Sequence, residues 1–161
     1  MGSTVPGNDW LAQKMNENEG KSVSIRNFDF PEDYPDVVNL WRNSGSGIHL
    51  RRSDESEEII KKIERDPDLF LVAENLGKVI GTVMGGFDGR RGMMYHLAVA
   101  TGYRQRGVGA ALMTELERRL RLKGCIRYYL LVTKDNLEAI RFYEARGWER
   151  MELFAYGKDL D

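Results

Sequence analysis

The sequence is poor in several residue types and patterns that mark particular classes of protein. Cys125 is the single cysteine among 161 residues, which excludes an intrachain disulfide and a cysteine-rich metal site. No run approaches the ~20 apolar residues that a membrane-spanning helix needs. Lys and Arg total 24 against 25 Asp and Glu, a formal net charge of -1, which argues against a nucleic-acid-binding surface. We therefore expect a cytoplasmic protein that holds no metal and binds neither nucleic acid nor membrane.

The composition is that of a globular chain of one domain. Hydrophobic residues make up 42% and charged residues 30% of the sequence, and this length suits one buried core. Residues 1–21 are rich in Gly, Asn, Ser and charged residues and are predicted to form a flexible N-terminal extension. The alternative is an arm that docks on a partner subunit through Trp10, Leu11 and Met15. Residues 22–161 are predicted to fold as a single domain.

Hydrophobic periodicity predicts alternating strands and helices after residue 22. Val37, Leu40 and Trp41 share one helical face, and a second helix follows with Ser53 or Asp54 as its cap. A hairpin turn is expected at 75–78, a long helix at 107–123 and another at 136–146. Strands are expected near 23–28, 69–73, 79–84, 93–99, 126–132 and 148–156. This order predicts an α/β (α+β) fold, with a mixed, mostly antiparallel central sheet of about seven strands and helices on both faces.

The stretch from Leu97 to Ala110 is predicted to be a strand, a loop and the first turn of a helix. The first N–H groups of a helix lack intrahelical acceptors and carry the positive end of the helix dipole. Gly107 and Gly109 have no side chains there, so a phosphate can approach the backbone. Arg104 and Arg106 add positive charge. The stretch therefore favours phosphate binding, although a glycine-rich loop alone leaves the ligand open.

Two familiar nucleotide motifs do not fit this loop. Leu112 occupies the position of the third glycine in the dinucleotide fingerprint, and the Gly-Lys-Ser/Thr of the P-loop is absent. Instead, Arg104-x-x-Gly107-x-Gly109 resembles the first signature of the GNAT superfamily of N-acetyltransferases. The segment Asn136-x-x-Ala139-x-x-Phe142-Tyr143-x-x-x-Gly147-Trp148 is similar to the second signature of that superfamily. The resemblance covers about residues 22 to 157 and looks closest to its RimI-like and YpeA-like bacterial branch.

The resemblance implies a GNAT fold and acetyl-CoA as cofactor. In this superfamily the first signature binds the pyrophosphate of coenzyme A, the preceding strand pairs with the pantetheine arm, and the second signature contacts that arm. Tyr143 aligns with the tyrosine that protonates the departing thiolate, and it also borders the cofactor. The cofactor-binding residues so implied are Leu97, Ala98, Val99, Arg104, Gln105, Arg106, Gly107, Val108, Gly109, Ala110, Asn136, Ala139, Phe142 and Tyr143.

A general base is harder to find. Met93 and Leu131 stand where many relatives carry a carboxylate, so Tyr95 is left as a weak second catalytic candidate. Period-two alternation places Tyr95 on the strand face of Leu97 and His96 on the opposite face, where a structural role is expected. In the loop between the first two helices, His49 and Arg51 are expected, together with Tyr95, to bind the substrate.

These features predict an N-acetyltransferase that moves an acetyl group from acetyl-CoA to a primary amine by direct attack in a ternary complex. Without a strong base, a peptide or metabolite α-amine is the easier acceptor, because about 1 in 7 is neutral at pH 7 against about 1 in 2,500 lysines. The alternatives are a non-catalytic acyl-CoA-binding sensor and, more remotely, a nucleotide-binding interaction domain. A homodimer through the last strands, common in this superfamily, is left open.

Overall fold

The computed structural model describes residues 23–160, and the predicted extension 1–21 lies outside them. The chain divides into two compact units between Leu131 and Val132. The second unit contains one helix, α5 (Leu137–Glu144). The elements of the first unit are β1 (Val23–Asn27), α2 (Tyr34–Arg42), η1 (Gly45–Gly47), η2 (Arg52–Asp54), α3 (Ser56–Arg65), β2 (Phe70–Asn75), β3 (Lys78–Phe87), β4 (Gly92–Val99), η3 (Thr101–Tyr103), α4 (Val108–Leu122) and β5 (Tyr128–Leu130), where η marks a 3-10 helix.

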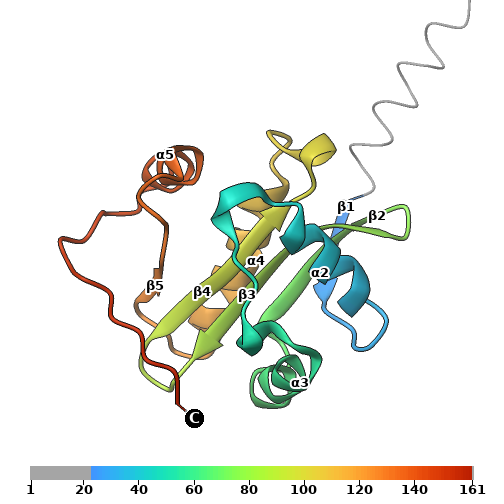
Figure 1. The fold of residues 1–161 in the computed structure, drawn as a ribbon, viewed down its shortest axis with the longest axis horizontal. Coiled ribbons are helices and arrows are strands. Elements are labelled where there is room, and N and C mark those ends of the chain that lie inside the picture. Colours follow the sequence, from blue (N-terminus) through green and yellow to red (C-terminus); the bar gives the residue numbers. More distant parts are fainter. Residues whose placement is uncertain (1–22, 161) are drawn as a thin grey trace, which may run out of the picture. The chain divides into compact units, whose positions relative to one another are not determined.

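The strands form one mixed sheet in the order β1-β2-β3-β4-β5. The first four are antiparallel to their neighbours, and β5 runs parallel to β4. Helix α4 covers one face of this sheet, and α2 and α3 lie on the other (Figure 1). The mixed sheet with helices on both faces is confirmed.

The prediction of about seven strands is wrong, because residues 23–160 contain five. The expected closing strand at 148–156 is absent, and Leu153, Phe154 and Tyr156 are exposed there. Alternation of apolar residues makes a strand only when a neighbouring strand accepts its hydrogen bonds. No strand of the described chain pairs with this segment.

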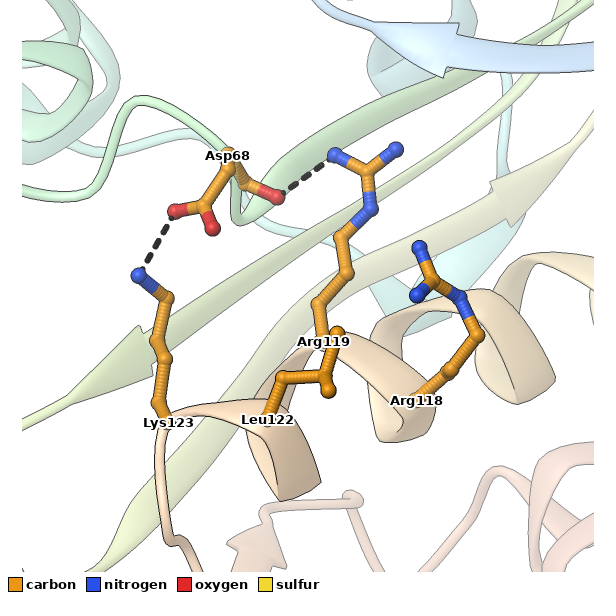
Figure 2. Close-up of a pocket in the computed structure, with 5 residues that line it drawn as sticks. All are labelled: Asp68, Arg118, Arg119, Leu122 and Lys123. Atoms are coloured by element: carbon orange, nitrogen blue, oxygen red, sulfur yellow. Dashed lines mark hydrogen bonds and ion pairs between the residues drawn. The ribbon is translucent and has the colours of Figure 1, made fainter.

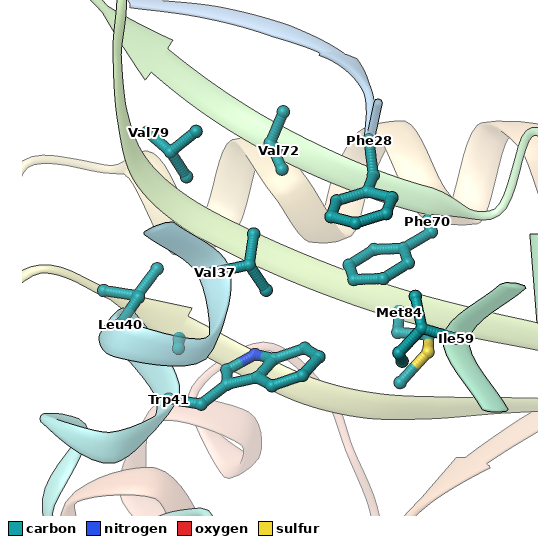
Figure 3. Packing of buried hydrophobic residues seen from close by; sticks show 10 residues of the cluster. Phe28, Val37, Leu40, Trp41, Ile59, Phe70, Val72, Val79 and Met84 are labelled. Atoms are coloured by element: carbon teal, nitrogen blue, oxygen red, sulfur yellow. The ribbon is translucent and has the colours of Figure 1, made fainter. Parts of the chain in front are cut away.

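The core between the sheet and α2 is built on stacked aromatic rings (Figure 3). The ring of Phe28 stacks on that of Phe70 at 4.1 Å between centroids, and the indole of Trp41 lies parallel to Phe70 at 6.0 Å. The predicted helical face of Val37, Leu40 and Trp41 is buried. Burying side chains of this size contributes roughly 1.5–3 kcal/mol each, so this cluster fixes α2 on the sheet.

The start of α3 differs from the prediction. Neither Ser53 nor Asp54 caps the helix, because Glu55 is the N-cap residue and makes no side-chain cap bond. Asp54 belongs to the preceding 3-10 helix η2 and is buried. Its carboxylate accepts a hydrogen bond from the backbone N–H of Arg51, with 2.9 Å between N and Oδ2. The polar residue before the helix thus ties down the α2–α3 loop instead of the helix end.

Helix α4 packs against β3 at two glycines. A Cβ at Gly81 would lie 3.1 Å from Leu112 Cδ1, and one at Gly85 would lie 2.5 Å from Leu116 Cδ1. Both leucines are fully buried, and their four-residue spacing places them on one face of the helix. The glycines therefore let the helix lie closer to the strand than any side chain would allow.

The predicted hairpin turn at 75–78 and the predicted end of the long helix near 123 are confirmed by backbone angles. Gly77 has φ 77° in the two-residue turn between β2 and β3, and Gly124 has φ 83° just after α4. Leu76 also has positive φ, 51°, which a leucine adopts at a cost. No helix within residues 23–160 is long and apolar enough to cross a membrane.

Candidate active site

Among the strands of residues 23–160, none pairs with one edge of β4 over its second half. β4 pairs with β5 only at Gly92–Met94, whereas on its other side it pairs with β3 as far as Val99. The N–H of Ala100 donates to the carbonyl of Ile80 on β3 at 2.8 Å. By alternation, the backbone groups of Val99 face away from β3, whereas Leu97 lies in the stretch where the register with β3 shifts. A ligand with amide groups can therefore add along this edge as a further strand.

Ala98 differs from its two neighbours. It pairs with Thr82 on β3, and its side chain is buried in the core. By the same alternation its backbone faces β3, so Val99 is the residue of this predicted trio that presents its N–H at the open edge, while its carbonyl accepts from Arg104.

The loop after β4 leads directly into α4. Gly107, the N-cap residue, has φ 82°, and Gln105 has φ 59°. The first hydrogen bond of the helix runs from Ala111 N–H to Gly107 C=O, so the N–H groups of Val108, Gly109 and Ala110 have no acceptor inside the helix. A Cβ at Gly107 would meet no atom within 4 Å. The loop thus offers amides and open space at the positive end of a 15-residue helix.

The two arginines of this loop take different positions. Arg104 donates from Nε to the carbonyl of Val99 at 3.0 Å, which ties the loop to the end of β4. Arg106 is exposed, with its guanidinium carbon 5.7 Å from the centroid of the Tyr103 ring. Both charges stay beside the start of α4.

The second unit carries the other predicted site residues on or beside α5. Asn136 caps this helix, with its Oδ1 accepting from the N–H of Ala139 at 3.1 Å. The ring of Tyr143 makes edge contacts with Phe142 and Trp148, at 5.3 and 5.8 Å between centroids. Burial raises the pKa of Tyr143 to about 12. The phenol therefore keeps its proton at neutral pH.

The predicted substrate residues lie in the first unit. His49 and Arg51 are exposed in the α2–α3 loop, as expected. Tyr95 on β4 is 44% exposed, and its ring lies beside Gly86 and Lys62. Burial, and after it the negative charge of Asp66, raise the pKa of Tyr95.

The prediction that Tyr95 and His96 point to opposite faces of β4 is wrong. The register with β3 shifts between Thr82 and Met84, and His96 has φ 48°, which marks a bulge. The His96 ring meets Trp41 of α2 edge-on, with 4.8 Å between centroids, while Tyr95 lies against the α3 side. Because the bulge interrupts period-two alternation, both rings lie on the face covered by α2 and α3. His96 Nε2 is 2.7 Å from Asp54 Oδ1, a pair that the strand pattern did not reveal.

A hollow of about 420 Å³ at the C-terminal end of α4 is not suited to bind the phosphate-bearing ligand expected at the loop before α4 (Figure 2). It is lined by Asp68, Leu122 and three cationic side chains. Lys123 pairs with Asp68 at 2.9 Å, Arg119 donates to the Asp68 carbonyl at 2.8 Å, and Arg118 pairs with Glu115. The charges are neutralised locally, and the hollow lies at the opposite end of α4 from Gly107. Within residues 23–160, no group of three or more metal-binding side chains is arranged to hold an ion.

Comparisons with known proteins agree with this geometry. Residues 34–148 match the model of the acetyltransferase (GNAT) family. An acetyltransferase of Pectobacterium atrosepticum is 40% identical over 131 residues, covering 80% of this chain and 90% of the relative. The chain therefore belongs to the GNAT family of acetyltransferases, and it is an acyl-transferring enzyme.

Solved structures share the fold. The PaiA N-acetyltransferase of Thermoplasma acidophilum, in complex with coenzyme A, has a TM-score of 0.74 at 22% identity, covering 83% of this chain and 93% of that one. Ard1 of Thermoplasma volcanium has a TM-score of 0.69 at 28% identity, covering 78% and 82%. GNAT acetyltransferases take the acetyl group from acetyl-CoA.

Proposed function

We propose that this chain is an acetyl-CoA-dependent N-acetyltransferase acting on a primary amine, with both substrates bound at once. The amine is the N-terminal α-amine of a peptide or protein, or a primary amine of a small molecule. The observation that carries the proposal is the loop before α4. Gly107 adopts a left-handed conformation, the space over its Cα is open, and the first turn of α4 follows at once. A pyrophosphate fits such a site because amides and helix dipole act together.

The remaining cofactor contacts follow from the open edge of β4. The backbone of Leu97 and the N–H of Val99 are assigned to the pantetheine arm, and Asn136, Ala139 and Phe142 are assigned to the same arm. Asn136 uses Oδ1 as a helix cap, so its side-chain N–H₂ is the group assigned to the ligand. The residues assigned to the pyrophosphate are Arg104, Gln105, Arg106, Gly107, Val108, Gly109 and Ala110.

Tyr143 is assigned the role of proton donor. Acetyl-CoA supplies an activated thioester whose sulfur departs when the amine attacks. A phenol whose pKa is about 12 remains protonated at pH 7 and can donate to the sulfur as negative charge develops there. A positioned general acid of this kind contributes typically about 10²–10⁴-fold in rate.

The acceptor is assigned to the side of β4 where the α2–α3 loop lies, with His49, Arg51 and Tyr95 as substrate contacts. An α-amine is favoured over a lysine side chain because more of it is neutral at pH 7. Membership of the RimI-like and YpeA-like branch is proposed on the resemblance over about residues 22 to 157. A cytoplasmic location and a homodimer stay predictions.

Isothermal titration with acetyl-CoA tests the cofactor site. Gly107→Arg should abolish binding, because the new side chain enters the open space over the loop. Gly124→Arg is the matched control: Gly124 has φ 83° against 82° for Gly107, and a Cβ added at either glycine would meet no atom within 4 Å, yet Gly124 lies at the other end of α4. Equal loss in both variants would show strain rather than a binding site, and no binding by the wild-type chain would refute the proposal.

A second candidate is a non-catalytic acyl-CoA sensor of the same fold. It is favoured by Met93 and Leu131, apolar residues where many relatives carry a carboxylate base. Tyr143→Phe separates the two functions. The enzyme should lose turnover while keeping its affinity for acetyl-CoA, whereas a sensor has no turnover to lose.

A further inference from the structure

The α2–α3 loop is joined to β4 by a buried carboxylate and a histidine. Asp54 Oδ1 lies 2.7 Å from His96 Nε2, and its Oδ2 accepts from the backbone N–H of Arg51 at 2.9 Å. The hydroxyl of Tyr34 on α2 donates to the carbonyl of Asp54 at 3.0 Å. Trp41 closes one side of the imidazole. Both residues of the pair are therefore held from several directions.

This arrangement fixes the tautomer of the histidine. Asp54 is a carboxylate: burial pushes its pKa up, but hydrogen bonds from His96 and the Arg51 amide outweigh burial and lower it. A carboxylate only accepts hydrogen bonds, so Nε2 carries the proton. Nδ1 then keeps its lone pair, and it has no hydrogen-bond partner among residues 23–160. The side chain is 21% exposed, which leaves room for a small group to reach it.

The position of His96 relates it to the candidate site. It occupies the bulge of β4, just past the last residue that pairs with β5. The open edge of the strand begins there, and the α2–α3 loop that carries His49 and Arg51 meets the strand at Asp54. The imidazole thus lies on the α2–α3 face of β4, where it is hydrogen-bonded to the loop assigned to the acceptor, and its backbone lies where the edge assigned to the acetyl carrier begins.

We propose that His96 is the catalytic base, which takes the proton of the acceptor amine at Nδ1, and that Asp54 is its positioning residue. This proposal rests on the acetyltransferase function proposed above. It supplies the base that Met93 on β4 and Leu131, just after β5, cannot provide. Tyr95 is a poor alternative, because its raised pKa keeps the phenol protonated and unable to accept.

The step balances in protons and electrons. The amine nitrogen forms a bond to the carbonyl carbon of the thioester, and the carbon–sulfur bond breaks with its electron pair left on sulfur. His96 Nδ1 accepts the proton that nitrogen loses, and Tyr143 donates one proton to sulfur. The carboxylate of Asp54 stabilises the imidazolium so formed, and both groups return to their starting states by exchange with water.

Three variants test the proposal. His96→Gln keeps an N–H₂ group that can reach Asp54 but cannot act as a base. The positive φ of position 96 is compatible with glutamine, because Gln105 of this chain has φ 59°. His96→Asn tolerates the left-handed backbone but is too short to reach Asp54. Asp54→Asn keeps the imidazole in place but weakens the hydrogen bond that orients it. Each variant is measured for melting temperature, acetyl-CoA affinity and transfer to tetrapeptides with free α-amines.

We expect His96→Gln and His96→Asn to lower kcat by about 10²–10⁴-fold, with acetyl-CoA affinity unchanged. His96→Gln should melt as the wild-type chain does. Asp54→Asn should lower kcat at least 10-fold with little change in KM. If the pair only anchored the loop, His96→Gln would keep its turnover and only the shorter His96→Asn would suffer, which would overturn the proposal.

Nitrogen NMR of the imidazole provides a readout that requires no acceptor. In the neutral imidazole of the wild-type chain, we expect the proton on Nε2 and a lone pair on Nδ1, and finding the proton on Nδ1 would overturn the proposal even if a variant fails to fold. Different results refute the proposed function and the proposed role of His96. Absence of acetyl-CoA binding refutes the acetyltransferase proposal itself, whereas full turnover in His96→Gln refutes only the role of His96.

Discussion

Two adjacent glycines of β3 should respond in opposite directions to the same substitution. In Gly85→Ala the new Cβ would lie 2.5 Å from Leu116 Cδ1, about 1 Å closer than the ~3.5–4.0 Å of ordinary carbon contacts. Leu116 is fully buried on α4, so either its rotamer or the helix must shift. Overpacking of this kind costs about 1–3 kcal/mol, against roughly 0.4–1 kcal/mol gained from the stiffer unfolded chain.

The neighbouring Gly86→Ala is the matched control. Its Cβ would face the other side of the sheet, 3.6 Å from Tyr95 Cε2, which is an ordinary contact. Only the gain from the unfolded chain applies, so this variant should be stabilised by about 0.4–1 kcal/mol. Both positions share one strand, so their strand propensities cancel in the comparison.

Thermal and urea unfolding measure the difference. We expect Gly85→Ala to melt about 2–8 °C lower and Gly86→Ala slightly higher than the wild-type chain. In the Gly85→Ala background, Leu116→Ala should destabilise less than it does alone, because it removes the overlap, and the double-mutant cycle should give about 1 kcal/mol or more of coupling. Equal stability of the two alanine variants, with no coupling, would refute the close packing of α4 on β3.

Three further predictions concern local structure. Leu76→Asn should raise the free energy of unfolding by about 1 kcal/mol, since asparagine tolerates the positive φ of this hairpin turn; a melting curve unchanged or lowered would contradict this. Asp33→Asn should make the free energy of unfolding less dependent on pH in the acid range. Burial raises the pKa of Asp33, but the hydrogen bonds from Arg26 and the Asp29 amide, together with the charge of Arg26, outweigh burial and lower the pKa. The contribution of Asp33 to stability is therefore full above about pH 4 and lost as pH falls through the lower folded value; identical acid titrations of both proteins would exclude it. Asn136→Ala should cost about 1 kcal/mol of helix stability by removing the cap on Ala139 N–H, seen as faster amide exchange at the start of α5; unchanged exchange there would show that the cap contributes nothing.

Much of the first unit could be predicted from sequence because local rules decide it. The three-and-four spacing of Val37, Leu40 and Trp41 gives one buried face whatever the partner. Gly77 and Gly124 mark turns because only glycine readily takes the positive φ found there. Features that depend on distant partners were missed. The segment 148–156 has the alternation of a strand, but pairing depends on a neighbouring edge that no local pattern specifies.

The candidate site, too, could be predicted from the sequence only where local rules decide it. The loop from Arg104 to Ala110 was predictable as a strand-to-helix turn, because Gly107 takes the positive φ that precedes the helix; its ligand followed only from the resemblance to the GNAT superfamily. The Asp54–His96 pair was not, because it joins residues 42 positions apart across a bulge that period-two reasoning cannot foresee. Asp54 resembled a helix cap in the sequence, and a short 3-10 helix turned it toward the strand instead.

The most direct test of the acetyltransferase account is transfer itself. Isotopically labelled acetyl-CoA is incubated with the wild-type chain and a set of peptides and small amines, each present in a free form and in an amine-blocked form, and products are read by mass spectrometry. The account predicts label on free amines only, with α-amines preferred, and a large loss of rate in Tyr143→Phe. Saturable acetyl-CoA binding with no label on any free amine would contradict it and leave a binding protein of the same fold.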